Sequence, residues 1–264
     1  MLTTEHRLER RLPDIPGPPS KLLELLEVRV VPELATTLAA LPLLQFAPRG
    51  DGHPVLVLPG LVATDGSTHL MRAFLADRGY AVQGWGLGRN VGLVPGLEAK
   101  MVERVRSLHG ETGRAVSLVG VSLGGLYARE LAARLPSAVR SVVSLGAPVR
   151  GRPRDTNVWR LYEMASGRRV DDARIRRPRV PPADVPTTSI FSRSDGLVAW
   201  QACVESPTDR RECIEVVGSH CGLGVNAAAL HAIADRLAQP EGEWRPFDRG
   251  GWRGVLYPDP YRPA

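Results

Sequence analysis

A serine flanked by two glycines lies between a strand pattern and a helix pattern, and this arrangement restricts the fold more than any other part of the sequence. Residues 115–119 are apolar and resemble a buried strand, whereas residues 125–131 resemble the start of a helix. A turn this tight would strain the backbone of Ser122, and side chains at positions 120 and 124 would collide with the adjacent strand or helix. The Ser122 hydroxyl would then be exposed at the carboxyl end of a sheet. The alternative is an ordinary glycine-rich turn.

Strand and helix patterns alternate from residue 54 onward. Alternating elements are joined by crossovers, which give a parallel sheet with helices on both faces. We therefore predict an α/β fold with a mostly parallel sheet of about six strands. The first strand would follow a helical arm directly, without a leading hairpin. The expected strands are residues 54–58, 81–82, 115–119, 141–145, 187–191 and 213–217, and the expected helices begin after Ser67 and cover 97–108, 125–131 and 226–237.

The length of 264 residues suits one α/β domain with a large core, and we expect residues 1–264 to form a single domain. Residues 1–50 are expected to be an N-terminal helical arm, with helices over 20–46 that are capped by Ser20 and bent at Pro32. This arm could pack on the body, form a flap over the substrate groove, or face a membrane.

Two further stretches break the alternation. Residues 152–186 are rich in arginine and proline, with one short helix expected over 157–164. An insertion there lies above the carboxyl ends of the strands, where ligands enter an open sheet, so we expect a small lid. Residues 239–264 are rich in proline, glycine and aromatic residues, and we expect an extended tail on the surface.

Composition argues against several classes of protein. The net charge of +6 is carried almost wholly by arginines spread along the chain, without a recognised nucleic-acid-binding module, so we expect no nucleic-acid partner. The first 19 residues lack the apolar core of a secretory signal, and charges and prolines interrupt the hydrophobic stretch over 22–47. We therefore expect a cytoplasmic protein without a transmembrane span, and peripheral contact with a lipid surface stays open. The oligomeric state is left open too.

The three cysteines, Cys203, Cys213 and Cys221, do not have the spacing of a zinc site. We expect free thiols, with a bridge between Cys203 and Cys213 as the alternative. No other set of residues forms a metal-ligand pattern, so we expect neither a metal ion nor a cofactor.

A serine hydroxyl near neutral pH needs a base, and the base needs a carboxylate to orient it. In proteins with such a serine turn between a strand and a helix, the chain order is serine, acid, histidine. Only His220 and His231 lie downstream of Ser122. His220 follows the strand at 213–217 and lies in a loop, where the base is required, whereas His231 lies within the last helix. We therefore favour His220.

The acid should follow the preceding strand. Asp195 lies just beyond the strand at 187–191, whereas the alternative, Asp184, precedes that strand and lies at the wrong end of the sheet. An aspartate in such a turn is also a common turn former, and its place one strand before the histidine favours catalysis. The predicted catalytic residues are Ser122, Asp195 and His220.

An oxyanion hole needs two backbone N–H groups directed at the substrate carbonyl oxygen. The amide of Leu123, directly after the nucleophile, is the first candidate. The second should come from the loop after the first strand, where Gly60 allows close approach, and we choose Leu61. The amides matter here, so the residue types carry little information.

Together these residues resemble the α/β-hydrolase superfamily, and within it the bacterial lipase and esterase branch. The resemblance covers residues 54–238. Lipases of that branch often carry His-Gly before the oxyanion residue, where this chain has Pro59-Gly60. The expected lid is also shorter than in many lipases. The motifs that carry the resemblance are residues 58–61, 120–124, 145–148 with Gly151, 194–196 and 220–223.

The resemblance implies a carboxylic ester hydrolase, an esterase or lipase acting through an acyl-enzyme on Ser122, with a small-molecule or lipid ester as substrate. An acyltransferase or thioesterase would use the same three residues on another acceptor or bond. A non-catalytic protein of this fold that binds an apolar ligand is the alternative from a different class. The sequence does not specify the acyl chain or the alcohol.

Overall fold

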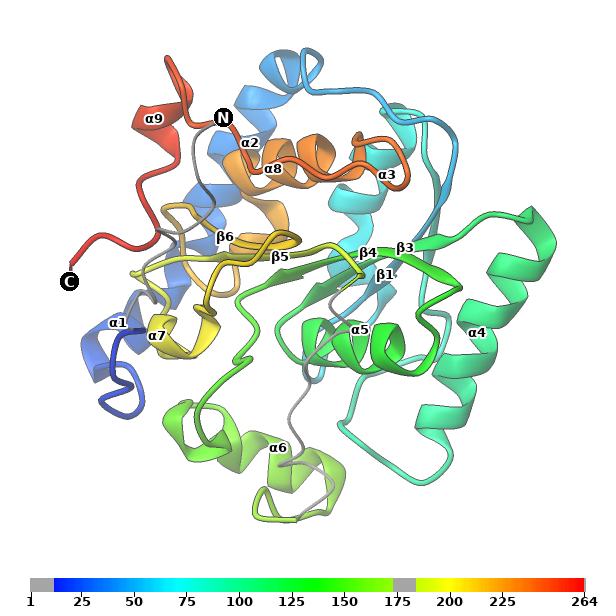
Figure 1. Ribbon diagram of the computed structural model, residues 1–264. Coiled ribbons are helices and arrows are strands. Elements are labelled where there is room, and N and C mark those ends of the chain that lie inside the picture. Colours follow the sequence, from blue (N-terminus) through cyan, green and yellow to red (C-terminus); the bar gives the residue numbers. More distant parts are fainter. Residues whose placement is uncertain (1–11, 173–183, 264) are drawn as a thin grey trace.

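The computed structural model describes residues 12–172 and 184–263, and the predicted sheet is present within them (Figure 1). Its six strands are all parallel, in the order β2-β1-β3-β4-β5-β6. Strands β1 and β5 are buried at every position, because helices cover both faces, and this explains the continuous apolar run of β1. The strands are β1 (Pro54–Leu58), β2 (Ala81–Gly84), β3 (Val116–Val121), β4 (Val139–Leu145), β5 (Thr187–Phe191) and β6 (Arg211–Glu215).

Helices on the two faces create two apolar cores (Figure 1). The helices of these layers are α2 (Val30–Leu44), α3 (His69–Asp77) and α8 (Ala227–Leu237) on one face, and α4 (Leu97–Thr112) and α5 (Leu123–Arg134) on the other. Met71 of α3 and Ile233 of α8 share one core with Val119 of β3. Met101 of α4 shares the other core with Leu118. Leu118 and Val119 serve opposite cores because successive side chains of a strand point to opposite faces.

The N-terminal arm leads directly into β1, as predicted. It consists of α1 (Lys21–Leu25), η1 (Leu26–Arg29) and α2. Ser20 caps α1 as expected, because its hydroxyl accepts a hydrogen bond from the Leu23 amide at 3.3 Å. The bend predicted at Pro32 is wrong. The break is the 3₁₀ segment η1, and Pro32 lies in the first turn of α2, where its missing N–H needs no partner.

The start of α3 also differs from the prediction. Ser67 does not cap this helix but lies in a preceding 3₁₀ turn, η2 (Asp65–Thr68). Thr64 caps that turn by accepting a hydrogen bond from the Gly66 amide at 3.3 Å. The other short elements are η3 (Pro153–Asp155), α6 (Trp159–Ser166), α7 (Trp200–Cys203), η4 (Leu223–Val225) and α9 (Arg253–Leu256).

The stretch expected to be a lid, 152–186, contains α6, which begins two residues later than predicted. Its residues 173–183 lie outside the described part of the chain. The stretch expected to be an extended tail, 239–264, is mainly irregular over its described residues and includes the short helix α9.

The cysteines carry free thiols, so the alternative bridge between Cys203 and Cys213 is not formed. Both of these side chains are buried, and burial raises the pKa of Cys213 to about 12. Cys221 is exposed as a residue, yet burial of its thiol and the Glu27 carboxylate raise its pKa to about 12. Cys213 and Cys221 are therefore protonated at neutral pH.

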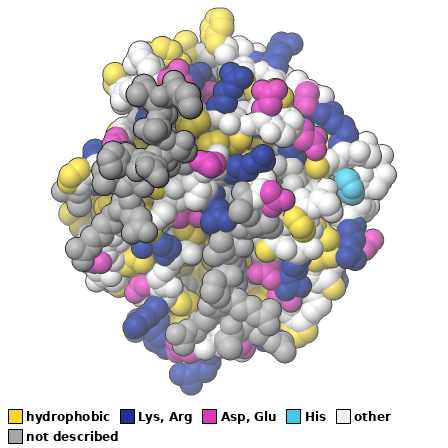
Figure 2. Space-filling model, in the orientation of Figure 1, with side chains coloured by type: hydrophobic (Ala, Val, Ile, Leu, Met, Phe, Trp, Pro, Cys, Tyr) yellow, Lys and Arg dark blue, Asp and Glu magenta, His cyan; other side chains and the backbone are white. Residues whose placement is uncertain are grey.

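Charged side chains of both signs are interspersed on the face of the molecule shown in Figure 2. The arginine excess therefore does not form one continuous basic field on that face. None of the helices in the described ranges combines the length and the hydropathy needed to span a bilayer.

A buried ion pair joins α5 to the segment after α7. The Arg129 guanidinium donates two hydrogen bonds to the Glu205 carboxylate, at 2.7 and 2.6 Å. The two side chains are 2% and 11% exposed, so water screens the pair poorly. Because α5 begins directly after Ser122, this pair helps to fix the helix behind the serine turn.

We expect Glu205→Gln to lower the free energy of unfolding by about 3 kcal/mol, because it leaves the buried Arg129 charge without its counter-ion. Urea unfolding followed by circular dichroism measures the loss. The matched control is Glu24→Gln, which breaks an exposed pair with Lys21 and should cost less than about 1 kcal/mol. Equal losses in the two variants would contradict this account.

Candidate active site

The turn between β3 and α5 has the strained geometry expected of it. Ser122 adopts φ 51° and ψ −117°, a conformation that residues with a Cβ rarely adopt. Its amide donates a hydrogen bond to the Leu145 carbonyl of β4 at 2.7 Å, which anchors the turn to the next strand. A Cβ at Gly120 would overlap the backbone of Gly124, and one at Gly124 would overlap the Leu58 carbonyl. Both glycines are therefore required by close backbone contacts.

Asp195 and His220 meet in the loops that follow β5 and β6. His220 Nδ1 lies 2.6 Å from Asp195 Oδ2. Because a carboxylate only accepts hydrogen bonds, the proton lies on Nδ1 and the lone pair on Nε2. The other oxygen, Asp195 Oδ1, accepts hydrogen bonds from the amides of Leu197 and Val198 at 2.9 and 2.7 Å. The carboxylate is thus held on both sides and points one oxygen at the imidazole.

The His220 imidazole is buried, and two opposing effects act on its charge. Burial alone would lower its pKa. The charge and hydrogen bond of Asp195, together with the Glu27 carboxylate, raise the pKa by more, so it lies above its ordinary value. Glu27 comes from η1 of the N-terminal arm. The surroundings of His220 therefore favour the protonated imidazolium.

The His220 loop packs at the same edge of the sheet as the serine turn. Gly146, which follows β4, approaches the imidazole so closely that a Cβ there would lie 3.0 Å from Nδ1. Next to it, the amide of Ser122 bonds to Leu145. The short helix η4 after His220 lies against Val121, where a Cβ at Gly224 would be 3.8 Å from the valine side chain. Over the described residues no hydrogen bond joins the Ser122 hydroxyl to the imidazole.

The loop expected to supply the second oxyanion amide is also strained and is braced by Asn90. Val62, next to Leu61, has φ 55°, which is a genuine outlier for a β-branched residue. Its amide bonds to the Asn90 carbonyl at 2.7 Å, and the buried Asn90 side chain donates to the Pro59 carbonyl at 2.8 Å. Within the described chain, no hydrogen bond uses the amides of Leu61 or Leu123, so both remain available to a ligand.

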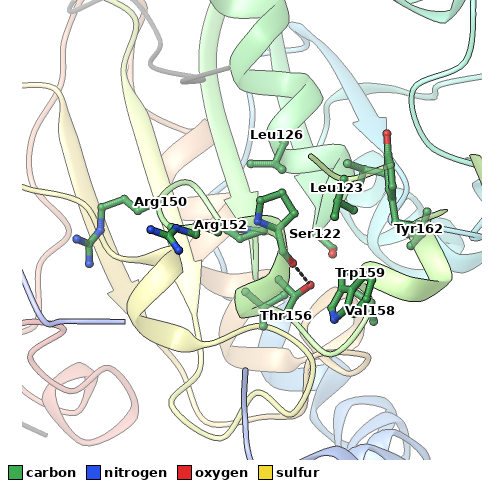
Figure 3. Close-up of a pocket in the computed structure, with 15 residues that line it drawn as sticks. Ser122, Leu123, Leu126, Arg150, Arg152, Thr156, Val158, Trp159 and Tyr162 are labelled. Atoms are coloured by element: carbon green, nitrogen blue, oxygen red, sulfur yellow. Dashed lines mark hydrogen bonds between the residues drawn. The ribbon is translucent and has the colours of Figure 1, made fainter. Parts of the chain in front are cut away.

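A mainly apolar pocket of about 120 Å³ opens beside Ser122 (Figure 3). In Figure 3, Ser122 lies among side chains of α5 and α6, while the Arg150 and Arg152 guanidinium groups extend away from it. Arg150 donates instead to the Val204 and Gln201 carbonyls. Lining residues include Leu61, Ser122, Leu123, Leu126, Trp159 and Tyr162.

The residues that we considered as alternatives lie elsewhere. His231 lies within α8, and its Nδ1 is 3.0 Å from the Tyr257 hydroxyl of the C-terminal segment. Asp184 precedes β5, and its carbonyl accepts a hydrogen bond from Arg210 at 3.0 Å. Among the described residues, neither is hydrogen-bonded to Asp195 or His220.

A hydrogen-bonded Asp–His–Ser series occurs at the opposite edge of the sheet. His53 Nδ1 lies 2.5 Å from Asp51, and Nε2 lies 2.9 Å from the Ser117 hydroxyl. His53 and Ser117 are both 0% exposed, so a substrate cannot reach the hydroxyl. Burial and the charges of Arg140 and Arg114 lower the His53 pKa against the opposing effect of Asp51, so the imidazole is neutral at pH 7. This series is a structural hydrogen-bond network.

Sequence reasoning missed two buried polar residues that contact the site, Asn90 and Glu27. The Pro59 carbonyl is 31 residues from Asn90 along the chain, and the His220 amide is 193 residues from Glu27. Neither residue belongs to a motif, and only the folded arrangement brings it to its partner. In the parts of the chain that the structure describes, no three His, Cys, Asp or Glu side chains are grouped to hold a metal ion.

No protein-family model matches the sequence, and no curated protein matches it either. Solved structures share its architecture. One is from the study of LipS and LipT, two metagenome-derived lipolytic enzymes, with a TM-score of 0.53 and 16% identity, covering 72% of this chain and 94% of that chain. The α/β hydrolase MGS-MChE2, from the metagenome of lagoon sediments at Mar Chica, Morocco, gives a TM-score of 0.51 at 17% identity. The match covers 71% of this chain and 90% of that chain. Lipase B of Aspergillus fumigatus gives a TM-score of 0.54 at 17% identity, and the match covers 73% of this chain and 54% of that chain.

These likenesses establish the fold. The chain has the α/β-hydrolase fold, with a parallel six-stranded sheet, helices on both faces and an N-terminal helical arm. This is the architecture that the sequence predicts.

We expect Gly124→Ala to destabilise the protein by about 3 kcal/mol or more, because the added methyl group overlaps backbone atoms that cannot move aside. The measurement is the free energy of unfolding in urea. Gly110→Ala in α4 is the matched control: nothing lies within 4 Å of its Cβ position, and alanine should add about 0.5–1 kcal/mol in a helix. A Gly124→Ala protein as stable as the wild type would show that the turn is looser than described.

Proposed function

We propose that the chain is a serine carboxylic ester hydrolase, of the esterase or lipase type, that acts through an acyl-enzyme on Ser122. The observation that carries this proposal is the 2.6 Å contact between Asp195 and His220 at the sheet edge where the strained serine turn opens on an apolar pocket. The fold shared with lipolytic enzymes and with a lipase supports the same class.

In this mechanism the Ser122 hydroxyl attacks the ester carbonyl carbon while His220 Nε2 accepts its proton. Asp195 holds the other imidazole proton on Nδ1 and stabilises the imidazolium. The imidazolium then gives its proton to the departing alcohol, and the acyl group remains on the serine. A water molecule, deprotonated by His220, attacks the acyl-enzyme and releases the acid.

The oxyanion formed in each step would accept hydrogen bonds from the amides of Leu61 and Leu123. Both residues line the pocket with Ser122, and both amides are available. Each such donor is worth roughly 10²–10³-fold in rate. The N-terminus of α5 lies directly behind the serine and adds favourable electrostatic potential for the developing negative charge.

The pocket favours an ester with a small apolar acyl group. Its volume of about 120 Å³ is below the usual range for sites that enclose a whole drug-sized ligand. Leu126, Trp159 and Tyr162 supply apolar walls, and the last two come from α6, within the stretch expected to be a lid. We propose that α6 forms one wall of the acyl site.

We expect Ser122→Ala to fold normally and to lose roughly 10⁴–10⁶-fold in kcat with p-nitrophenyl acetate. The variant should also lose covalent labelling by a fluorophosphonate. Ser117→Ala, in the buried series at the other edge of the sheet, is the control and should keep both properties.

Unchanged ester turnover in Ser122→Ala would reject the proposal. If the serine is labelled but the acyl group passes to an added alcohol or thiol rather than to water, the product identifies an acyltransferase. Preferred turnover of an acyl thioester would identify a thioesterase. Absence of labelling in the folded wild-type protein would favour a binding protein of this fold.

We also propose peripheral contact of the arm with an anionic lipid surface. Several large apolar side chains of the arm are exposed, although single exposed ones are common in proteins. The net charge of +6 suits an anionic rather than a neutral bilayer. The most exposed large apolar residues of the arm are Leu22, Leu25, Val28, Val31, Leu43 and Phe46.

We expect Leu25→Ser/Val28→Ser to weaken cosedimentation with phosphatidylglycerol–phosphatidylcholine vesicles by about 10-fold or more, since two side chains lose their insertion into the bilayer. Val255→Ser on α9 is the control, because Val255 is 82% exposed, against 75% for Val28, and the helix α9 lies away from α1 (Figure 1). Wild-type protein that stays in the supernatant would refute the contact.

A further inference from the structure

One carboxylate of the N-terminal arm binds both loops of the Asp195–His220 pair. Glu27 of η1 is only 8% exposed. Its Oε1 accepts hydrogen bonds from the amides of Gly196 and His220, at 2.8 and 2.9 Å. Its Oε2 accepts one from the Cys221 amide at 2.9 Å. Gly196 directly follows Asp195, so a single side chain joins the loop of the acid to the loop of the base.

A second pair from the arm holds the same two loops. Arg29 donates to the Ser194 carbonyl at 2.5 Å and to the Ser194 hydroxyl at 2.9 Å. Glu33, which accepts a hydrogen bond from Arg29 at 3.1 Å, also accepts from the amide and the hydroxyl of Ser219, at 2.8 and 2.5 Å. The residues directly before Asp195 and His220 are therefore bound as well.

The backbone of the arm lies directly against the acid loop. A Cβ at Gly196 would overlap the Leu23 carbonyl of α1. The contact therefore depends on a glycine directly after Asp195, and the Glu27 side chain can reach the Gly196 amide only because the chains are this close.

We infer that Glu27 is a positioning residue, which fixes the acid and base loops relative to each other and so holds Asp195 and His220 in hydrogen-bonding geometry. This inference rests on the proposed ester hydrolysis. Catalytic groups must be held within about 0.5 Å of the productive geometry, and side chains that support them typically change activity 10- to 100-fold when removed.

Electrostatics gives Glu27 a second measurable effect. Burial alone would raise its pKa. The three amide hydrogen bonds and the nearby His220 lower the pKa by more, so Glu27 is ionised at neutral pH. The charged groups facing this region are Asp195 from the loop after β5, and Glu27, Arg29 and Glu33 from the arm; Cys221 is protonated. The negative charge of Glu27 therefore favours the protonated imidazole.

Glu27→Gln removes the charge and places an amide NH₂ against backbone N–H donors. We expect kcat with p-nitrophenyl acetate to fall about 10- to 100-fold with KM nearly unchanged. The acidic limb of the kcat/KM profile should move to lower pH, because the imidazole loses its proton more readily. Fluorophosphonate titration counts active sites, so the loss in kcat is expressed per intact site.

Glu27→Asp keeps the charge but shortens the side chain by one methylene, and it remains informative if the glutamine variant does not fold. It should lower kcat while leaving the acidic limb in place. Glu24→Gln, one turn away on the exposed side of α1, is the matched control and should leave both readouts unchanged.

The His220 titration is also measured by NMR of its imidazole in wild type and Glu27→Gln, which requires no turnover. A wild type without ester hydrolysis refutes the proposed function, and a lower imidazole pKa in the variant then still supports the contact with Glu27. A wild type that hydrolyses esters, with kcat per site and imidazole pKa both unchanged in Glu27→Gln, overturns the positioning role.

Discussion

The strained backbone at Ser122 is the constraint on which the rest of the site depends. A non-glycine residue in such a conformation costs on the order of 1–3 kcal/mol, so the surrounding structure must impose it. Here the amide bond to Leu145 and the close contact of Gly124 with the end of β1 do so. These contacts fix the ends of three adjacent strands relative to α5. The loops that continue from neighbouring strands are then brought to the same edge.

Position in the sheet, rather than residue type, separates the Asp51–His53–Ser117 series from the Asp195–His220 pair. The His53 series begins at the amino ends of β1 and β3, where the side chains are enclosed and the histidine is neutral. The Asp195–His220 pair lies in loops at the carboxyl ends, where charge on the imidazole is favoured, and a pocket lies beside Ser122 at the same edge. Hydrogen bonds between an acid and a histidine are therefore weak evidence of catalysis unless a substrate can reach the neighbouring hydroxyl.

The sequence predicts the features that depend on local patterns and on strand order. The pairing of Asp195 with His220 follows from their places after successive parallel strands, and the two glycines around Ser122 follow from crowding in the turn. Features that depend on contacts between distant parts of the chain could not be predicted from the sequence. Nothing near Glu27 or Asn90 in the sequence indicates loops far along the chain, and the break in the arm lies at η1 rather than at Pro32.

The arm also explains how irregular loops can hold a precise geometry. The amides of Gly196, Ser219, His220 and Cys221 lie outside regular strands and find their acceptors on Glu27 and Glu33. Without the arm, these donors would need other partners or water, and a buried unsatisfied donor costs about 1–3 kcal/mol. The carboxylates need the amides in turn, because a buried ionised group is stable only when it is hydrogen-bonded. Docking of the arm and ordering of the two loops are therefore mutually dependent, which couples residues before the first strand to the geometry of the site after the last.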